Sequence, residues 1–202
     1  MGYLAELFRF PDWLTADELL ALHQELAASG RGAPERTQLL EQVGLADATR
    51  TKVGAMSKGM QQRLGIAQAL VGSPRLLMLD EPTSALDPVG RRVVRDLLRD
   101  LRGRGIAVVL SSHLLSEVEL VCDRVAILVG GGIVAQGTPA ELARPRGVEV
   151  ETADGVREFP AATRDEVPRI VADLVAGGAQ VYGVRLLAST LEDAYLEAVG
   201  AA

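Results

Sequence analysis

Two adjacent carboxylates, Asp80 and Glu81, directly follow an apolar run at residues 76–79 and precede Pro82. Parallel α/β sheets bind ligands beyond the carboxyl ends of buried strands, which is where this acid pair would lie. Asp80 could hold a hydrated Mg²⁺, and Glu81 could orient or deprotonate a water that attacks a phosphate. The pair also fits a strand that merely ends in polar turn residues, so taken alone it leaves both interpretations open.

Two other segments carry residues that fit phosphate chemistry. Ser57 precedes the helical sequence QQRLGIAQALV at a capping position, and the bare backbone at Gly59 would let helix-terminal N–H groups close on an anion. His113 ends the apolar run IAVVLSS, at what we expect to be the same sheet edge as the acids. Each also has an ordinary interpretation, as a capped helix and as a structural histidine.

The elements that would position these residues change character near Gly54. Before it, Thr15 and Glu18 have capping-box spacing for a helix that ends at Gly30 and Gly32, and a second helix runs from Pro34 to about Val43. After it, the apolar runs LLML, IAVVLSS and RVAILV alternate with helical segments. This alternation predicts buried strands in a mostly parallel sheet, and hence an α/β fold.

The composition shifts again near Arg146. VEVET, an Asp-Gly turn and VREF predict a hairpin, followed by a helix from about Asp165 and the strand VYGVRLL. A last helix after Thr190 would carry Leu191, Tyr195 and Val199 on its apolar side. We therefore predict one domain over residues 1–145, with a helical subdomain at about 7–72, and a small α+β accessory domain over 146–202.

The order and spacing of these segments resemble the ABC ATPase family. MSKGM stands where that family has its signature loop, LLMLDEP where it has the Walker B strand, SALD where it has the D-loop and SSH where it has the switch histidine. The match covers roughly residues 1–143, and the ending TLEDAYLEAV is similar to the exporter branch. The fold implied is a partial ABC-type P-loop ATPase domain, with a mostly parallel sheet, a helical subdomain and an α+β appendage.

The resemblance implies a role for each matching residue. Asp80 would be the magnesium ligand, Glu81 the general base and His113 the γ-phosphate sensor. Nucleotide contacts, made across a dimer interface by the signature residues, would come from Ser57, Lys58, Gly59 and Met60, with Asp87 linking the two sites. Lys58 replaces the first glycine of the family's signature, and its ammonium fits either a phosphate contact or an ordinary solvated lysine. Glu6 stands where the family usually has the Q-loop glutamine, and this departure weakens its expected metal role because a carboxylate cannot donate as an amide does.

The resemblance also implies cofactors and partners. ATP and Mg²⁺ would be bound, and the partners would be a second ABC ATPase subunit and a transmembrane permease subunit at the cytoplasmic face of the membrane. The formal net charge of −6 argues against nucleic acid as the main partner. Cys122, the single cysteine, gives no sign of an oxidising compartment, and no apolar run approaches the length of a membrane-spanning helix.

One expected motif is missing from the sequence. The family cradles ATP phosphates in a G-x-x-x-x-G-K-[ST] loop, and these residues contain no Gly-Lys pair. Gly2, Tyr3 and Leu4 are typical of the strand before the Q-loop, so we expect the chain to begin inside the domain and to be inactive alone. The alternatives are a fragment of a transporter ATPase, a natural half-subunit that donates its signature loop or acts as a scaffold, and a non-transport ABC protein acting on ribosomes or DNA.

Overall fold

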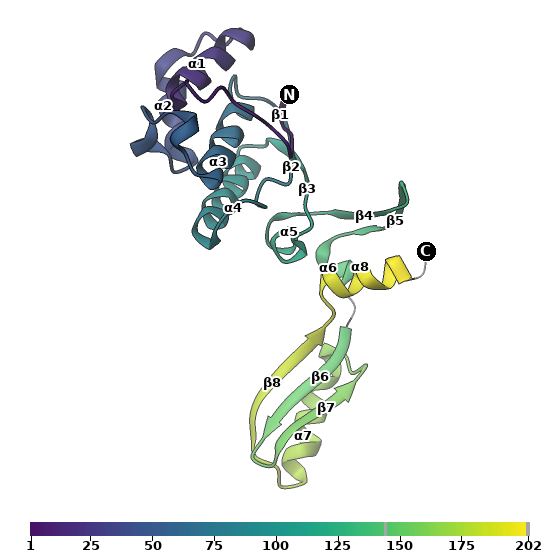
Figure 1. Cartoon of the computed structure of the whole chain (residues 1–202). Coiled ribbons are helices and arrows are strands. Elements are labelled where there is room, and N and C mark those ends of the chain that lie inside the picture. The colour runs from purple at the N-terminus through teal and green to yellow at the C-terminus, as the bar shows by residue number, and fades with distance from the viewer. Residues whose placement is uncertain (144, 201–202) are drawn as a thin grey trace. The chain divides into compact units, whose positions relative to one another are not determined.

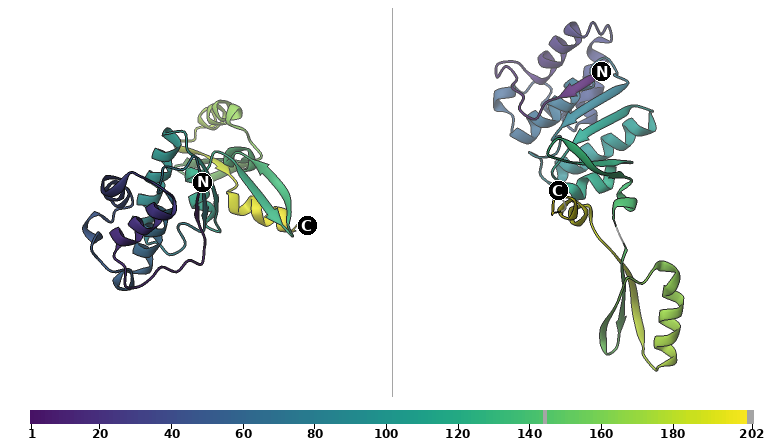
Figure 2. Two further views of the ribbon diagram at one scale, coloured as in Figure 1. Left: turned by 90° about the horizontal axis from the view of Figure 1, so that it is seen from above. Right: turned by 90° about the vertical axis from the view of Figure 1, so that its right-hand side faces the viewer.

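The computed structural model describes residues 1–143 and 145–200 and divides into two compact units, Met1–Leu114 and Leu115–Ala202. The predicted domain boundary at 145/146 falls beside residue 144, which lies outside the described residues, as do the last two residues of the predicted accessory domain. Figure 1 labels the elements of both units, and Figure 2 gives two further views of the ribbon.

The first unit opens with the predicted helical region. Its helices are α1 (Ala16–Leu26), α2 (Gly32–Gln42) and α3 (Lys58–Ala69), with short 3₁₀ turns at Ala46–Ala48 and Val53–Ala55. The capping box is confirmed, since the Glu18 N–H donates to Thr15 Oγ1 and the Thr15 N–H donates to Glu18 Oε2. The prediction that the first helix ends at Gly30 and Gly32 was wrong. Helix α1 stops at Leu26, and Ala28 turns the chain with a φ of 50°.

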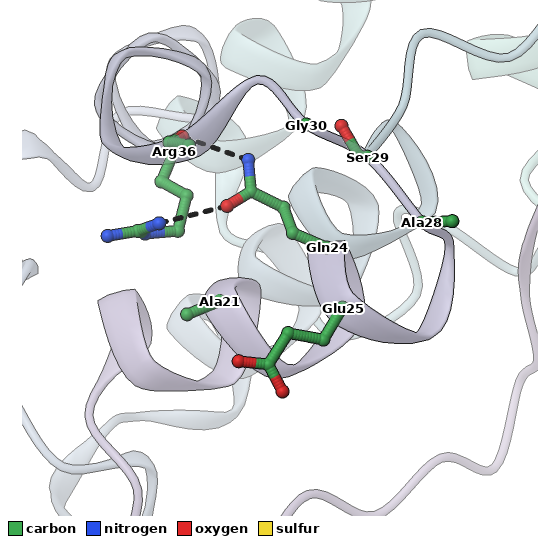
Figure 3. A pocket seen from close by; sticks show the side chains of 8 residues that line it. Ala21, Gln24, Glu25, Ala28, Ser29, Gly30 and Arg36 are labelled. Carbon is green, nitrogen blue, oxygen red and sulfur yellow. Dashed lines mark hydrogen bonds between the residues drawn. The ribbon is translucent and has the colours of Figure 1, made fainter.

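A buried polar network ties α1 to α2. Arg36 donates from Nε to Asp17 Oδ1 over 2.6 Å. It also donates from Nη1 to Gln24 Oε1 over 2.9 Å (Figure 3). Gln24 in turn donates to Glu35, whose other oxygen accepts from the Gly72 N–H, just after α3. These bonds satisfy charges that burial would otherwise penalise. The network borders a hollow of about 350 Å³ that lies on the helical region.

The parallel sheet of this unit has three strands in the order β1 (Gly2–Leu4), β2 (Leu76–Asp80) and β3 (Ala107–Ser111). Helix α4 (Pro88–Gly103) connects β2 to β3, as predicted. Central positions such as Leu77 and Leu79 are buried. The expectation that β3 is also buried was wrong, because β3 is an edge strand and its Val109 is 56% exposed.

The second unit begins with α5 (Leu115–Val121), β4 (Val125–Val129), β5 (Gly132–Gly137) and α6 (Pro139–Leu142). RVAILV forms a strand as predicted, but its place in the parallel sheet was wrong, because β4 pairs antiparallel with β5 in a separate two-stranded sheet. Gly130 and Gly131 cause the reversal, with φ of 57° and 85°, a backbone region that glycine enters without steric cost.

The rest of the second unit follows the predicted order of elements. Strands β6 (Pro145–Thr152), β7 (Gly155–Pro160) and β8 (Val181–Ala188) form an antiparallel sheet in the order β7-β6-β8, with α7 (Val167–Ala176) before β8. A last helix, α8 (Leu191–Gly200), contacts α5, β4 and α6. The expected apolar side of α8 holds only in part, since Leu191 is 1% exposed whereas Tyr195 and Val199 are 40% and 41% exposed.

Candidate active site

The acid pair lies at the carboxyl edge of the parallel sheet of the first unit. Asp80 ends β2 opposite Ser111, the last residue of β3, and Asp80 Oδ1 accepts a hydrogen bond from Ser111 Oγ. Leu4 ends β1 opposite Leu79, so Glu6 follows the same edge two residues later, where it is exposed. The parallel register therefore brings the ends of three strands together. The alternating pattern predicted this for β2 and β3, but the third strand that it placed in the sheet, RVAILV, lies elsewhere.

Glu81 takes an unusual backbone conformation. Its φ of 49° lies in the left-handed region, which costs a non-glycine residue on the order of 1 kcal/mol. The Glu81 N–H donates to the Ser111 carbonyl over 3.2 Å, while its own carbonyl accepts from Gln62 Nε2 over 3.1 Å and from Ser84 Oγ over 3.1 Å. These bonds hold the strained residue in place and turn its side chain back across the sheet edge.

That side chain meets His113. Glu81 Oε1 accepts from the His113 backbone N–H over 2.9 Å, and Glu81 Oε2 lies 2.8 Å from His113 Nδ1. The Glu81 side chain is 14% exposed and the His113 side chain 66% exposed. The two residues predicted as catalytic, which are distant in sequence, are thus in direct contact. With Nδ1 directed at the carboxylate, Nε2 is the ring nitrogen left to meet a ligand.

The signature segment forms the start of α3. Ser57 is the N-cap, and its Oγ accepts from the Met60 N–H over 3.2 Å. Gly59 faces the D-loop, where an added Cβ would lie 3.4 Å from the Ala85 carbonyl oxygen. Lys58 is exposed and Met60 half-buried in the same helical turn. Signature and D-loop are therefore in contact within this chain, while nucleotide contact by these residues stays a prediction.

Asp87 has a local partner. It is the N-cap of α4, with Oδ1 accepting from the Gly90 N–H over 2.7 Å. A Cβ on Gly90 would lie 3.0 Å from that same Oδ1, so the tight turn suits glycine. The structure thus gives Asp87 a helix-capping role, and its predicted link to a second site remains a prediction.

Sequence reasoning overlooked two residues that shape this site. Gln62 is 5% exposed and donates to the Glu81 carbonyl, while Ser111 contacts both Asp80 and the Glu81 N–H. A glutamine at a buried position of α3 was the available signal for the first, since a buried amide requires a partner. Ser111 was signalled by its place two residues before His113, at the end of β3.

The residues present fit a magnesium ion bound mainly by phosphate and water. Among the described residues no cluster of three or more His, Cys, Asp or Glu could enclose a metal. Mg²⁺ often binds through one or two carboxylates together with substrate phosphates and several waters, and Asp80 offers such a carboxylate at the sheet edge.

Open α/β sheets bind ligands beyond the carboxyl ends of their strands, which is where this acid pair lies. A family profile described as ABC transporter matches residues 1–84. An uncharacterized ABC transporter ATP-binding protein of Bacillus subtilis, YxlF, is 36% identical, with the match covering 100% of this chain and 76% of the relative. The chain belongs to the ABC transporter ATP-binding proteins.

Other relatives and solved structures agree. A fluoroquinolones export ATP-binding protein of Mycobacterium tuberculosis is 44% identical over 80% of this chain, which spans 58% of that relative. The ATP-binding subunit of an ABC transporter superimposes with a TM-score of 0.61 at 29% identity, covering 70% of this chain and 60% of the other. A dimeric ATP-binding cassette in a post-hydrolysis state, bound to ADP and Pi, gives 0.61 at 27% identity, covering 68% and 62%. The predicted family and α/β fold class are thus confirmed.

The part of the chain that the structure describes holds no helix of the length and apolarity that a membrane span requires.

Proposed function

We propose that this protein is the ATP-hydrolysing subunit of an ABC transporter, working at a dimer interface to drive transport through a separate membrane permease. The contact between Glu81 and His113 beside Asp80 carries the proposal. Glu81 and His113 act as catalytic residues, and Asp80 holds the Mg²⁺ that accompanies ATP. The protein works at the cytoplasmic face of the membrane, and the names of relatives in fluoroquinolone and Nod factor export favour export.

Glu81 serves as general base in this proposal. Each of its carboxylate oxygens accepts one bond from His113 and keeps a lone pair for an attacking water. The low exposure of Glu81 limits competing contacts with bulk water. Bound Mg²⁺ would neutralise charge on the phosphates, which lets the acid pair approach them. His113 then uses the nitrogen that Glu81 does not contact to meet the γ-phosphate.

The signature residues act on a nucleotide held by another subunit. Ser57, Lys58, Gly59 and Met60 open α3, where backbone N–H groups and the helix dipole favour an anion. Glu6 follows the strand β1 and is proposed to take the Q-loop position, while Asp87 contributes to the interface from the D-loop. The partner is a second ABC ATPase subunit, identical or related.

The 202 residues contain no Gly-Lys pair, so the proposed site needs a phosphate cradle that these residues do not themselves provide. On their own, Ser57 and Gly59 offer only a few hydrogen bonds to a strongly hydrated triphosphate. This observation favours a second candidate, in which the chain donates its signature segment to a partner's ATP site and hydrolyses nothing at its own.

Replacing Glu81 by glutamine in a chain that carries an upstream phosphate-binding loop tests the catalytic proposal. Glu81→Gln should keep ATP binding within about threefold but lower turnover by about 10²-fold or more, because the amide cannot accept the proton of water. ATPase assays and calorimetry measure the two quantities. Glu117→Gln, at a carboxylate outside the sheet edge, is the matched control and should leave turnover unchanged. Turnover at the parental rate in Glu81→Gln would remove Glu81 from the base role, whereas absence of turnover in the parental protein itself would favour the signature-donor alternative.

A further inference from the structure

Strand β8 presents an unpaired edge with apolar side chains. It lies at one side of the sheet β7-β6-β8 and pairs only with β6 among residues 1–143 and 145–200 (Figure 1). Three alternate side chains on it are exposed, with fractions of 66% at Tyr182, 41% at Val184 and 47% at Leu186. Exposed apolar edge strands are templates for pairing with another strand.

The two faces of this sheet differ in chemistry. Val148 and Val150 of β6 are fully buried and stand opposite Leu186 and Val184, so the exposed apolar residues of β8 continue the face that holds the small core. On the other face, Arg185 donates from Nε to Glu149 Oε1 over 3.1 Å.

The other pair of opposed residues on that polar face lacks one side chain, because one of its members is a glycine. Gly183 stands opposite Glu151, and an added Cβ on Gly183 would lie 3.4 Å from Glu151 Oε2. The edge at Gly183 therefore has no side chain to shield the Glu151 carboxylate from a neighbouring strand. A cationic side chain placed over Gly183 would meet an opposite charge.

A second copy of this strand, paired with the first, would supply that cation. If two β8 strands pair antiparallel about a twofold axis at Val184, Tyr182 of each copy stands opposite Leu186 of the other, and Gly183 stands opposite Arg185. The apolar residues then form one continuous face. The Arg185 guanidinium is flanked by Glu149 of its own copy and by Glu151 of the other, across the open Gly183 position. Shifting the axis to Arg185 would instead set two guanidinium groups face to face, which disfavours that register.

We propose that two copies of this chain associate through β8, without nucleotide, to form a continuous six-stranded antiparallel sheet centred on Val184. The contact is isologous, since the same strand serves both copies, and the pairing uses up the exposed edge. It is separate from the ATP-dependent interface of the proposed function, which involves residues of the first unit. Its consequence is that two subunits stay together between rounds of ATP binding.

A single engineered cysteine tests the register. In the 202-residue chain with Cys122→Ser, Val184→Cys should give a disulfide-linked dimer as the main species under mild oxidation, because directly opposed residues in an antiparallel pair lie about 4.5–5.5 Å apart at Cα, within disulfide range. Val156→Cys, at a valine that is 58% exposed on the opposite edge strand β7, is the matched control. Thermal unfolding of each reduced variant checks that it is folded. A Val184→Cys protein that stays monomeric, or a Val156→Cys protein that cross-links equally well, would overturn the proposal.

Charge reversal provides an independent test by sedimentation without nucleotide. Arg185→Glu should raise the dimer dissociation constant about tenfold or more, since it sets like charges side by side. Combining it with Glu149→Arg and Glu151→Arg should restore dimerisation to within a few fold. Unchanged dimerisation in Arg185→Glu would contradict the charge argument. Because no ATP is present, failure here leaves the ATP-hydrolysis proposal intact, and failure of the Glu81→Gln test leaves this one intact.

Discussion

At the scale of single residues, the candidate site depends on a backbone conformation that sequence patterns do not reveal. The motif at residues 76–82 predicted that Asp80 and Glu81 end a strand, and β2 confirms it. It could not predict that Glu81 has a positive φ, since that region is uncommon for any residue other than glycine. The conformation follows from hydrogen-bond partners distant in sequence, the acceptor Ser111 and the donor Gln62, which sequence spacing does not connect.

The buried glutamine should therefore be needed for the position of Glu81. Gln62→Leu removes the donor to the Glu81 carbonyl and should lower the free energy of unfolding by about 1 kcal/mol, although Ser84 still donates to the same oxygen. Urea denaturation measures the loss. Gln68→Leu, at a half-buried position of the same helix, is the control and should have a smaller effect. Equal stability of the two variants would show that the Gln62 bond does not hold Glu81.

At the scale of elements, local signals predicted most helices and strands, and tertiary pairing decided the rest. Capping residues marked the starts of α1 and α3, because a cap is a contact within four residues. Burial of β3 and the pairing of β4 were predicted wrongly, since they depend on which strands lie alongside. An apolar run such as RVAILV is compatible with either a parallel or an antiparallel neighbour.

The capping boxes make the stability of these elements depend on pH. Hydrogen bonds from the Thr15 backbone and side chain hold the pKa of Glu18 below its usual range. The same kind of contact with a threonine lowers the pKa values of Glu141, Glu166 and Asp193. Since the folded-state pKa is depressed, this stabilisation is present above the unfolded pKa of about 4.3 for Glu and is lost as pH falls below it.

Thr15→Ala should expose this contribution in α1. The variant should be less stable at pH 7 by about 1 kcal/mol, the usual cost of losing an N-cap side chain. The pKa of Glu18, followed by NMR titration, should rise toward its ordinary value. Thr37→Ala, at an exposed interior position of α2, is the control: it should leave the Glu18 pKa unchanged and should stabilise the protein slightly, since alanine has the higher helix propensity. A Glu18 pKa that does not move in Thr15→Ala would contradict the assignment.

At the scale of the whole molecule, the last helix packs against elements that come earlier in the chain, so a division by residue number separates segments that are in contact. The predicted accessory domain, residues 146–202, includes α8, yet α8 contacts α5, β4 and α6, which precede that domain in sequence. Leu191 is almost fully buried, and its N–H donates to Glu119 Oε1 over 2.6 Å. The sequence spacing that placed a boundary near Arg146 carried no information on this long-range contact. The boundary therefore remains a proposal that deletion variants can refine.

Two deletions would separate the small sheet from the last helix. One ends the chain after Pro145, and the other replaces residues 146–188 by a short Gly-Ser linker and keeps α8. The linker can be short because Pro145 and Ala188 pair at neighbouring ends of β6 and β8. We expect the truncation to be less stable than the linker variant by roughly 2 kcal/mol or more, since it exposes the surface that Leu191 covers and leaves Glu119 without its donor.

Urea unfolding and limited proteolysis around α5 measure this difference. A linker variant with Leu191→Ala is the matched control, because it keeps the chain length and should lose most of the difference. Protection of α5 that is the same in the truncation and in the linker variant would mean that α8 adds nothing to the segment from Leu115 to Ala143. That result would support the predicted domain boundary at 145/146. Loss of protection in the truncation alone would instead show that α8 belongs with the segment from Leu115 to Ala143.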